Sequence, residues 1–146
     1  MRIVLPFDGS PSAQNAVGYI IGLGRDSDRR RLEVHLVNVQ EAMLGISDSF
    51  GRDAADVASH LADSARAAGM KLLSDPAGLL ESADIRVQSS VLIGDPATLI
   101  ADYTDKNRCD ALVMGTRGMG RIGGLLLGSV ASKIIHLVKV PVTLVK

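Results

Sequence analysis

The stretch that decides the fold runs from Ala111 to Ser129 and reads ALVMGTRGMGRIGGLLLGS. Its first four residues form a short apolar run, which is typical of a buried strand. A glycine-rich segment follows, and a helical pattern begins at Ser129 and continues to Val138. A glycine-rich turn between a strand and a helix exposes backbone N–H groups beside the positive end of the helix dipole. The stretch therefore predicts a strand, an anion-binding turn and a helix.

Strand and helix patterns alternate outward from this stretch along the chain. Apolar runs predict strands over residues 3–7, 32–39, 85–91, 111–114 and 141–145. Apolar residues at helical spacing predict helices that begin at Pro11, near Asp53, at Pro96 and at Ser129. Strictly alternating strands and helices form a parallel sheet. The prediction is an α/β fold: a five-stranded parallel sheet with helices on both faces.

Two of the predicted strands carry the marks of a sheet edge. Ile85, Val87 and Val91 alternate with polar residues, which indicates that one face of this strand is wet. Pro141 opens the last strand, and proline is tolerated only at the start of a strand or at an edge. We therefore expect both strands to lie at the periphery of the sheet.

The second helix and the segment before it are harder to delimit. Residues 40–52 contain two glycines and several small polar residues, which predicts a long loop. The helix is expected from about Asp53 to Ser74, because the sequence Asp75-Pro76-Ala77-Gly78 breaks its pattern. The alternative is an extension through Leu79 and Leu80 beyond a kink.

Composition limits the class of protein. The 146 residues suit one domain, residues 1–146, and the formal net charge of zero argues against general nucleic-acid binding. The N-terminus lacks the apolar segment of a signal peptide, and no apolar run approaches the ~20 residues that span a bilayer. A single cysteine, Cys109, leaves no disulfide framework. We expect a soluble cytoplasmic protein that binds neither membranes nor nucleic acids.

Charge is unevenly distributed along the chain. Asp110 is the last acidic residue, and the basic residues after it are Arg117, Arg121, Lys133, Lys139 and Lys146. A positive field over the glycine-rich turn favours an anionic ligand. The alternative is a solvated cationic face, and both interpretations stay open at this point.

The place where a ligand would bind follows from the sheet. In open parallel sheets, ligands bind beyond the carboxyl ends of the strands, where the strand order reverses. The ends of the first strand, at Phe7, Asp8 and Gly9, and of the fourth strand, at Gly115, are therefore the places to look. Both carry small residues, which agrees with a phosphate site.

Two familiar phosphate motifs do not fit the glycine-rich turn. The Walker pattern requires a Gly-Lys-Ser/Thr sequence that the chain lacks. Gly118 to Gly123 matches G-x-G-x-x-G, but the acidic residue that should follow about 20 residues later is missing. We interpret this match as a coincidence within a glycine-rich loop.

A longer frame fits better. Two residues separate Gly115 from Gly118, nine separate Gly118 from Gly128, and Ser129 follows directly. This spacing is similar to that in ATP-binding universal stress proteins. The flanking segments 4–10, 94–96, 127–131 and 140–145 resemble the same family. The resemblance implies a Rossmann-like fold similar to that of the adenine nucleotide alpha hydrolases, and it implies ATP as the ligand, with or without Mg²⁺.

The resemblance also implies the residues of the site. Gly115, Gly118 and Gly128 would let the backbone approach the phosphates, and Ser129 would add a hydroxyl donor. Asp8 would face the nucleotide through the ribose or a bound Mg²⁺. The full set of candidate nucleotide-binding residues is Pro6, Phe7, Asp8, Val39, Met114, Gly115, Arg117, Gly118, Gly128, Ser129, Val130 and Ala131, with Arg121 added on grounds of charge.

Each candidate also has a plain structural role. The glycines can relieve backbone strain in a sharp turn. Asp8 can cap the first helix together with Ser10, and Ser129 can cap the last. Val39 and Met114, which would line the adenine pocket, can equally be core residues.

Catalysis has little support in the sequence. Asp8 is the acid placed at the site, and the segment Asp8-Gly9-Ser10-Pro11-Ser12 lacks the Ser-Gly-Gly-x-Asp-Ser loop of related ATP pyrophosphatases. The interpretation is an ATP-binding module that regulates a stress response. The alternatives are a nucleotide-free dimeric interaction protein of the same fold, or a slow ATPase or nucleotide phosphotransferase. The resemblance further implies a homodimer, with the last strand, Val142 to Val145, as a reasonable seam, and an unidentified protein partner.

Overall fold

The structure is a computed structural model that describes residues 1–26, 32–41, 54–118 and 127–146. Strands and helices alternate as predicted, and most of their ends agree with the sequence within about two residues. The elements in chain order are β1 (Arg2–Pro6), α1 (Pro11–Asp26), β2 (Glu33–Gln40), α2 (Ala54–Ser82), β3 (Arg86–Ile93), α3 (Pro96–Lys106), β4 (Ala111–Gly115), α4 (Ser129–Leu137) and β5 (Val142–Val145).

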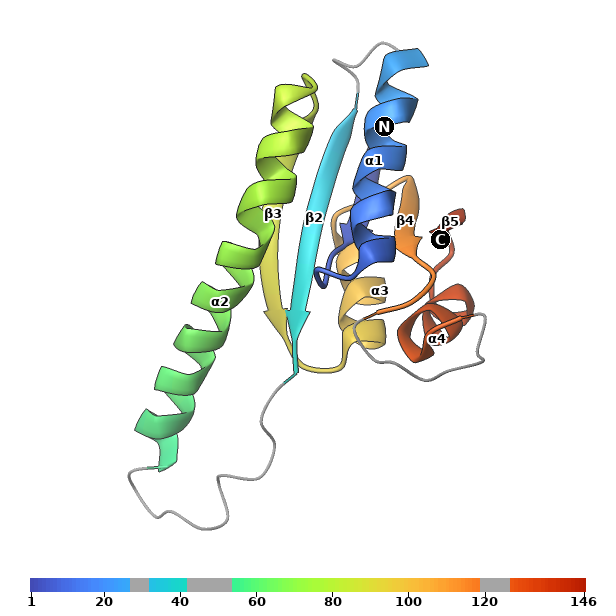
Figure 1. Ribbon diagram of the computed structural model, residues 1–146. Coiled ribbons are helices and arrows are strands. Elements are labelled where there is room, and N and C mark those ends of the chain that lie inside the picture. The colour runs from blue at the N-terminus through green and yellow to red at the C-terminus, as the bar shows by residue number, and fades with distance from the viewer. Residues whose placement is uncertain (27–31, 42–53, 119–126) are drawn as a thin grey trace.

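The five strands form one parallel sheet in the order β3-β2-β1-β4-β5. The chain moves outward from β1 to β3 and then returns to the other side of β1 with β4, so the strand order reverses between β1 and β4. The predicted edge strands, β3 and β5, are confirmed at the two edges. Helices α1 and α2 cover one face, and α3 and α4 cover the other (Figure 1).

The core is divided by the sheet into two apolar clusters. Because successive strand residues point to opposite faces, Ile3 and Leu5 of β1 pack beneath α1 and α2, whereas Val4 packs beneath α3 and α4. All three side chains are fully buried. Burial on both faces explains why β1 is a continuous apolar run, as is usual for a central parallel strand.

Helix α2 differs from the prediction. It continues through Pro76 to Ser82, so the expected end at Ser74 was wrong and the extension through Leu79 and Leu80 is confirmed. A proline inside a helix removes one backbone hydrogen bond and costs about 3 kcal/mol. Here Leu73, Pro76 and Leu80 lie on one buried face against the sheet. Burial on both sides of the proline offsets the lost hydrogen bond.

Some predictions fall on residues that the structure leaves undescribed. These include most of the loop 40–52, Asp53 at the start of the second helix, Arg121, and most of the G-x-G-x-x-G match. Within the described ranges, no helix combines the length and the apolar character needed to cross a membrane.

Candidate nucleotide site at the strand switch point

The carboxyl ends of β1 and β4 meet at the point where the strand order reverses, which is where ligands bind in sheets of this type. A Cβ atom added to Gly118 would lie 2.7 Å from the Oδ2 of Asp8. A Cβ atom added to Gly128 would lie 3.5 Å from the Cα of Arg117 and 3.6 Å from the backbone nitrogen of Gly118. The structure therefore brings Asp8, from the loop after β1, together with Gly118 and Gly128, from the connection between β4 and α4.

The loop after β1 is a tight turn that leads into α1. Gly9 has a φ of +83°, a conformation that side-chain-bearing residues rarely adopt. The Oδ1 of Asp8 accepts a hydrogen bond from the Ser10 N–H at 3.0 Å, and the Ser10 hydroxyl accepts one from the Ala13 N–H at 3.3 Å. Asp8 and Ser10 thus both have the turn and capping roles considered from the sequence. The second carboxylate oxygen of Asp8 lies on the side of Gly118.

Gly115 is explained by packing. A Cβ atom there would lie 2.5 Å from the Ser12 hydroxyl oxygen, 2.7 Å from the Ser12 carbonyl carbon and 2.8 Å from the Ala13 nitrogen. Two of these three atoms belong to the backbone of α1, which cannot move without moving the helix. Glycine at this position is required by the close approach of α1 to the end of β4.

The N-terminus of α4 forms the other wall of the site. Gly128 is its N-cap residue, with no side chain to bond the first turn, and its own N–H donates to the Thr116 carbonyl at 2.8 Å. The first N–H groups of a helix have no acceptor within the helix. Ser129 is exposed, whereas Ala131 is 2% exposed and packs in the core. Ala131 and the half-buried Val130 can therefore serve a ligand chiefly through their backbone.

The remaining candidates divide between core and surface. Met114 is buried, and Val39 packs against the same apolar cluster beneath α3 and α4. Phe7 is buried on the opposite face, and Pro6, at the end of β1, is half-buried. Arg117 is exposed. The structure thus gives Val39 and Met114 the core role foreseen as an alternative, and the nucleotide role of the whole set stays a prediction.

Two residues of this region escaped sequence reasoning. Ser12 lies buried between α1 and β4, and its hydroxyl contacts Arg117. Asn38, 3% exposed, donates from Nδ2 to the Phe7 carbonyl at 2.8 Å and so holds the loop after β1. Two sequence features could have revealed them: Asn38 is a polar residue inside an apolar strand, and Ser12 stands next to Ala13 on the buried side of α1.

The positive charge of the C-terminal part is partly neutralised. The Nζ of Lys133 lies 3.8 Å from the Oδ1 of Asp95, the N-cap residue of α3. Hydrogen bonds from the Thr98 N–H and hydroxyl, aided by Lys133, hold the pKa of Asp95 below its ordinary value.

The described part of the chain contains no group of three or more His, Cys, Asp or Glu residues suited to a metal ion.

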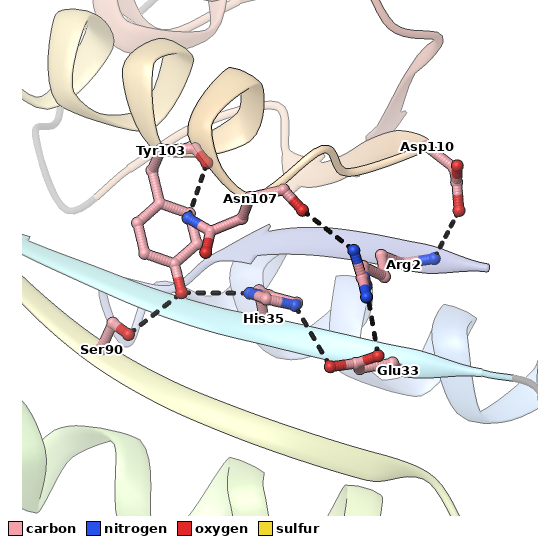
Figure 2. Close-up of polar contacts among 7 residues, drawn as sticks. All are labelled: Arg2, Glu33, His35, Ser90, Tyr103, Asn107 and Asp110. Carbon is pink, nitrogen blue, oxygen red and sulfur yellow. Dashed lines mark hydrogen bonds and ion pairs between the residues drawn. The ribbon is translucent and has the colours of Figure 1, made fainter.

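The opposite, amino end of the sheet carries a chain of charged and polar side chains that contact one another (Figure 2). The Nε of Arg2 lies 3.4 Å from the Oε2 of Glu33, and the Oε1 of Glu33 lies 3.5 Å from the Nε2 of His35. The other ring nitrogen of His35 is 3.1 Å from the Tyr103 hydroxyl, which is also 3.1 Å from the Ser90 hydroxyl. A broad cavity of about 590 Å³ borders Glu33 at this end, remote from the switch point.

The comparisons with known proteins agree with the fold and identify the family. A model described as the Universal stress protein family matches residues 1–146, and the chain belongs to this family. A universal stress protein of Thermus aquaticus is 31% identical over 144 residues, covering 99% of this chain and 97% of the relative.

Solved structures of the family share the architecture. The universal stress protein UspA from Lactobacillus plantarum superposes with a TM-score of 0.82 at 18% identity, covering 100% of this chain and 97% of that one. A universal stress protein family protein from Arabidopsis thaliana, solved with AMP bound, gives a TM-score of 0.69 at 18% identity, covering 100% and 91% of the two chains. The fold of this chain is that of the universal stress proteins.

Proposed function

We propose that this chain is a single-domain, ATP-binding universal stress protein that regulates a stress response through the occupancy of its nucleotide site. The observation that carries the proposal is the convergence of Asp8, Gly118 and Gly128 at the strand switch point. The related Arabidopsis thaliana protein, which was solved with AMP, supports a nucleotide as the ligand class.

Backbone groups would hold the phosphates. The Gly118 nitrogen lies 3.6 Å from the position of a Cβ atom added to Gly128, and Gly128 is the N-cap residue of α4, so the N–H groups of Gly118 and of the first turn of α4 are the candidates. The positive end of the helix dipole favours an anion there. The exposed Ser129 can add its hydroxyl, and the exposed Arg117 can add a cation.

The negative charge of Asp8 limits which part of a nucleotide it can contact. A carboxylate beside Gly118 would repel a bare phosphate, so it suits either a ribose hydroxyl or an Mg²⁺ ion carried by the phosphates. Mg²⁺ bound to a nucleotide commonly uses one or two protein carboxylates and keeps several waters. The adenine ring would lie against Val39 and Met114, beside the backbone of Pro6 and Phe7.

Regulation is favoured over catalysis. Phosphoryl transfer requires groups that position the attacking water and neutralise charge on the leaving group. Asp8 is the carboxylate that the described residues place beside Gly118. A slow ATPase and a nucleotide-free interaction protein are the alternative outcomes, and the cytoplasm is the proposed location.

The deciding experiment measures ATP binding to Gly128→Ala. The added Cβ atom makes only ordinary contacts of 3.5–3.6 Å with the Thr116–Gly118 backbone, so the folded state accommodates it. We expect the free energy of unfolding to stay within about 0.5 kcal/mol of wild type. Isothermal titration calorimetry with Mg²⁺ and ATP should show affinity at least about tenfold weaker, because the methyl group occupies the path of the phosphates.

The matched control is Gly78→Ala in α2, where nothing described lies within 4 Å of the added atom. Its ATP affinity should equal that of wild type. Wild-type protein that binds no ATP would favour the interaction protein, and equal affinity in both variants would refute the site. Phosphate release measured on the same samples separates a binding module from a slow ATPase.

We further propose a homodimer formed through β5. The carbonyls of Pro141 and Val145 accept hydrogen bonds from β4 and the segment after it, so the backbone groups of Val142 and Leu144 point away from the sheet. Unpaired groups on an edge strand are available to a second strand. Sedimentation equilibrium should show a dimer that Leu144→Pro disrupts and Leu144→Ala keeps, because both lose packing but only proline removes the N–H.

A further inference from the structure

The main-chain carbonyl of Arg117 is held by two serine hydroxyls from α1 and the loop before it. The Ser10 hydroxyl lies 3.1 Å from this oxygen, and the Ser12 hydroxyl also donates to it. The Ser12 oxygen in turn lies 3.4 Å from the Arg117 nitrogen and accepts its N–H. The two peptide units that flank Arg117 are thus both anchored: the Thr116–Arg117 unit through its N–H, and the Arg117–Gly118 unit through its C=O.

The arrangement uses the hydroxyl hydrogens of both serines and both lone pairs of the carbonyl oxygen. Each serine has one hydroxyl hydrogen, and a carbonyl oxygen has two lone pairs to receive them. Ser10 also accepts from the Ala13 N–H at 3.3 Å, so it caps α1 while it holds Arg117. Ser10 and Ser12 are 1% and 9% exposed, so water has little access to replace either contact.

The anchored carbonyl sets the direction of the next N–H group. In a trans peptide the C=O and the following N–H point in opposite directions, and the described residues contain no cis bond. With the Arg117 oxygen turned toward α1, the Gly118 N–H points away from α1. The Gly118 nitrogen lies 3.6 Å from the position of a Cβ atom added to Gly128, so it borders the place between Asp8 and Gly128 where the phosphates would lie under the proposed function.

The opposite orientation of this peptide would be harmful to the site. If the peptide rotated, the Arg117 carbonyl oxygen would point into the gap and repel a phosphate. Gly118 makes such a rotation easy, because glycine adopts positive and negative φ about equally well. The loop needs glycine for its close approach to Asp8, so the orientation must be fixed by other residues.

We propose that Ser10 and Ser12 are positioning residues that preorganise the phosphate site by locking the Arg117–Gly118 peptide with its N–H outward. This inference rests on the proposed nucleotide site and deepens it. The orientation of this peptide should affect the affinity for ligands that carry a phosphate chain. It should not affect the affinity for adenosine, which has no phosphates.

The test uses Ser12→Ala, because Ser12 holds Arg117 without capping α1. If the outward orientation falls to about one tenth of the molecules, the apparent dissociation constants of ATP and of inorganic tripolyphosphate rise about tenfold. The dissociation constant of adenosine should not change. The control is Ser82→Ala, which removes a 2.7 Å hydroxyl-to-carbonyl bond to Gly78 in α2, far along the chain from the site.

A second readout needs no ligand. In ¹H–¹⁵N spectra of the free protein, the Gly118 amide signal should move in Ser12→Ala and stay in place in Ser82→Ala. If the Gly118 signal does not move, the serines do not fix the orientation of the Arg117–Gly118 peptide, and this result holds whether or not the wild-type protein binds a nucleotide. If the wild-type protein binds no nucleotide, the proposed function fails separately. Equal tripolyphosphate affinities of wild type and Ser12→Ala overturn the positioning role and leave the nucleotide site intact. Thermal melts check that each variant is folded.

Discussion

The two ends of the sheet are built from different chemical groups. At the amino end, charged and polar side chains bind one another: Arg2 contacts Glu33, Glu33 contacts His35, and His35 contacts Tyr103 (Figure 2). At the carboxyl end, between β1 and β4, the contacts are mostly between hydroxyls and backbone groups, and glycines stand where the segments approach closely.

This difference is the reason for placing the proposed nucleotide at the carboxyl end. At the amino end a ligand would have to displace existing side-chain partners, although the buried Nε2 of His35, 3.5 Å from Glu33, makes no hydrogen bond to the described residues. At the carboxyl end, serine hydroxyls hold the Arg117 carbonyl and the next residue is Gly118, so backbone N–H donors are left for a ligand. The first end would serve stability and the second binding, and substitutions at the two ends should separate these properties.

The largest effect is expected for Gly115→Ala. The added Cβ atom would lie 2.5–2.8 Å from Ser12 and the backbone of α1. Overpacking of this kind costs about 3 kcal/mol of unfolding free energy, which urea titration would measure. Gly22→Ala in α1, with open space around it, should leave stability equal or slightly higher. A stable Gly115→Ala protein would contradict the close packing of α1 on β4.

A moderate effect is expected at the amino end for Tyr103→Phe. The change deprives the His35 ring and the Ser90 hydroxyl of the group that bridges them. Leaving buried polar groups without a partner costs about 1–3 kcal/mol. ATP affinity should equal that of wild type once the protein is folded. A loss of ATP binding in folded Tyr103→Phe would break the proposed separation of the two ends.

A smaller effect is expected for Asp8→Asn at the carboxyl end. The asparagine oxygen can still accept from the Ser10 N–H, so the turn is kept while the charge is removed. Without Mg²⁺, ATP should bind more tightly by about 1 kcal/mol, roughly fivefold, because a repulsion is lost. With Mg²⁺, it should bind more weakly. Unchanged affinity under both conditions would place Asp8 away from the phosphates.

The smallest effect is expected for Asp95→Ala at the start of α3. The lowered pKa of Asp95 means that its ionised form stabilises the fold. This contribution is fully present above about pH 4 and is lost as the pH falls through the lowered pKa. Thermal melts should show a small difference from wild type at neutral pH that shrinks on acidification. A difference that grows in acid would contradict the direction of the shift.

Much of the fold was predictable because its signals are local. Proline at Pro96, one residue after the N-cap Asp95, marked the start of α3, and Pro141 together with the alternation around Val87 marked the edge strands. Part of the candidate site was predictable for the same reason. The spacing of Gly118 and Gly128 and the place of Asp8 after the first strand are properties of the sequence alone.

By itself, the sequence determined the order of the elements, the two edge strands and the glycine frame, since each depends on residues close together in the chain. Only the tertiary structure decided that α2 passes through Pro76, that Ser12 reaches Arg117, and that His35 bridges Glu33 and Tyr103. These features depend on side chains from separate elements meeting in a packed interior. Burial and long-range hydrogen bonds outweigh local preference there, and neither leaves a periodic mark on the sequence.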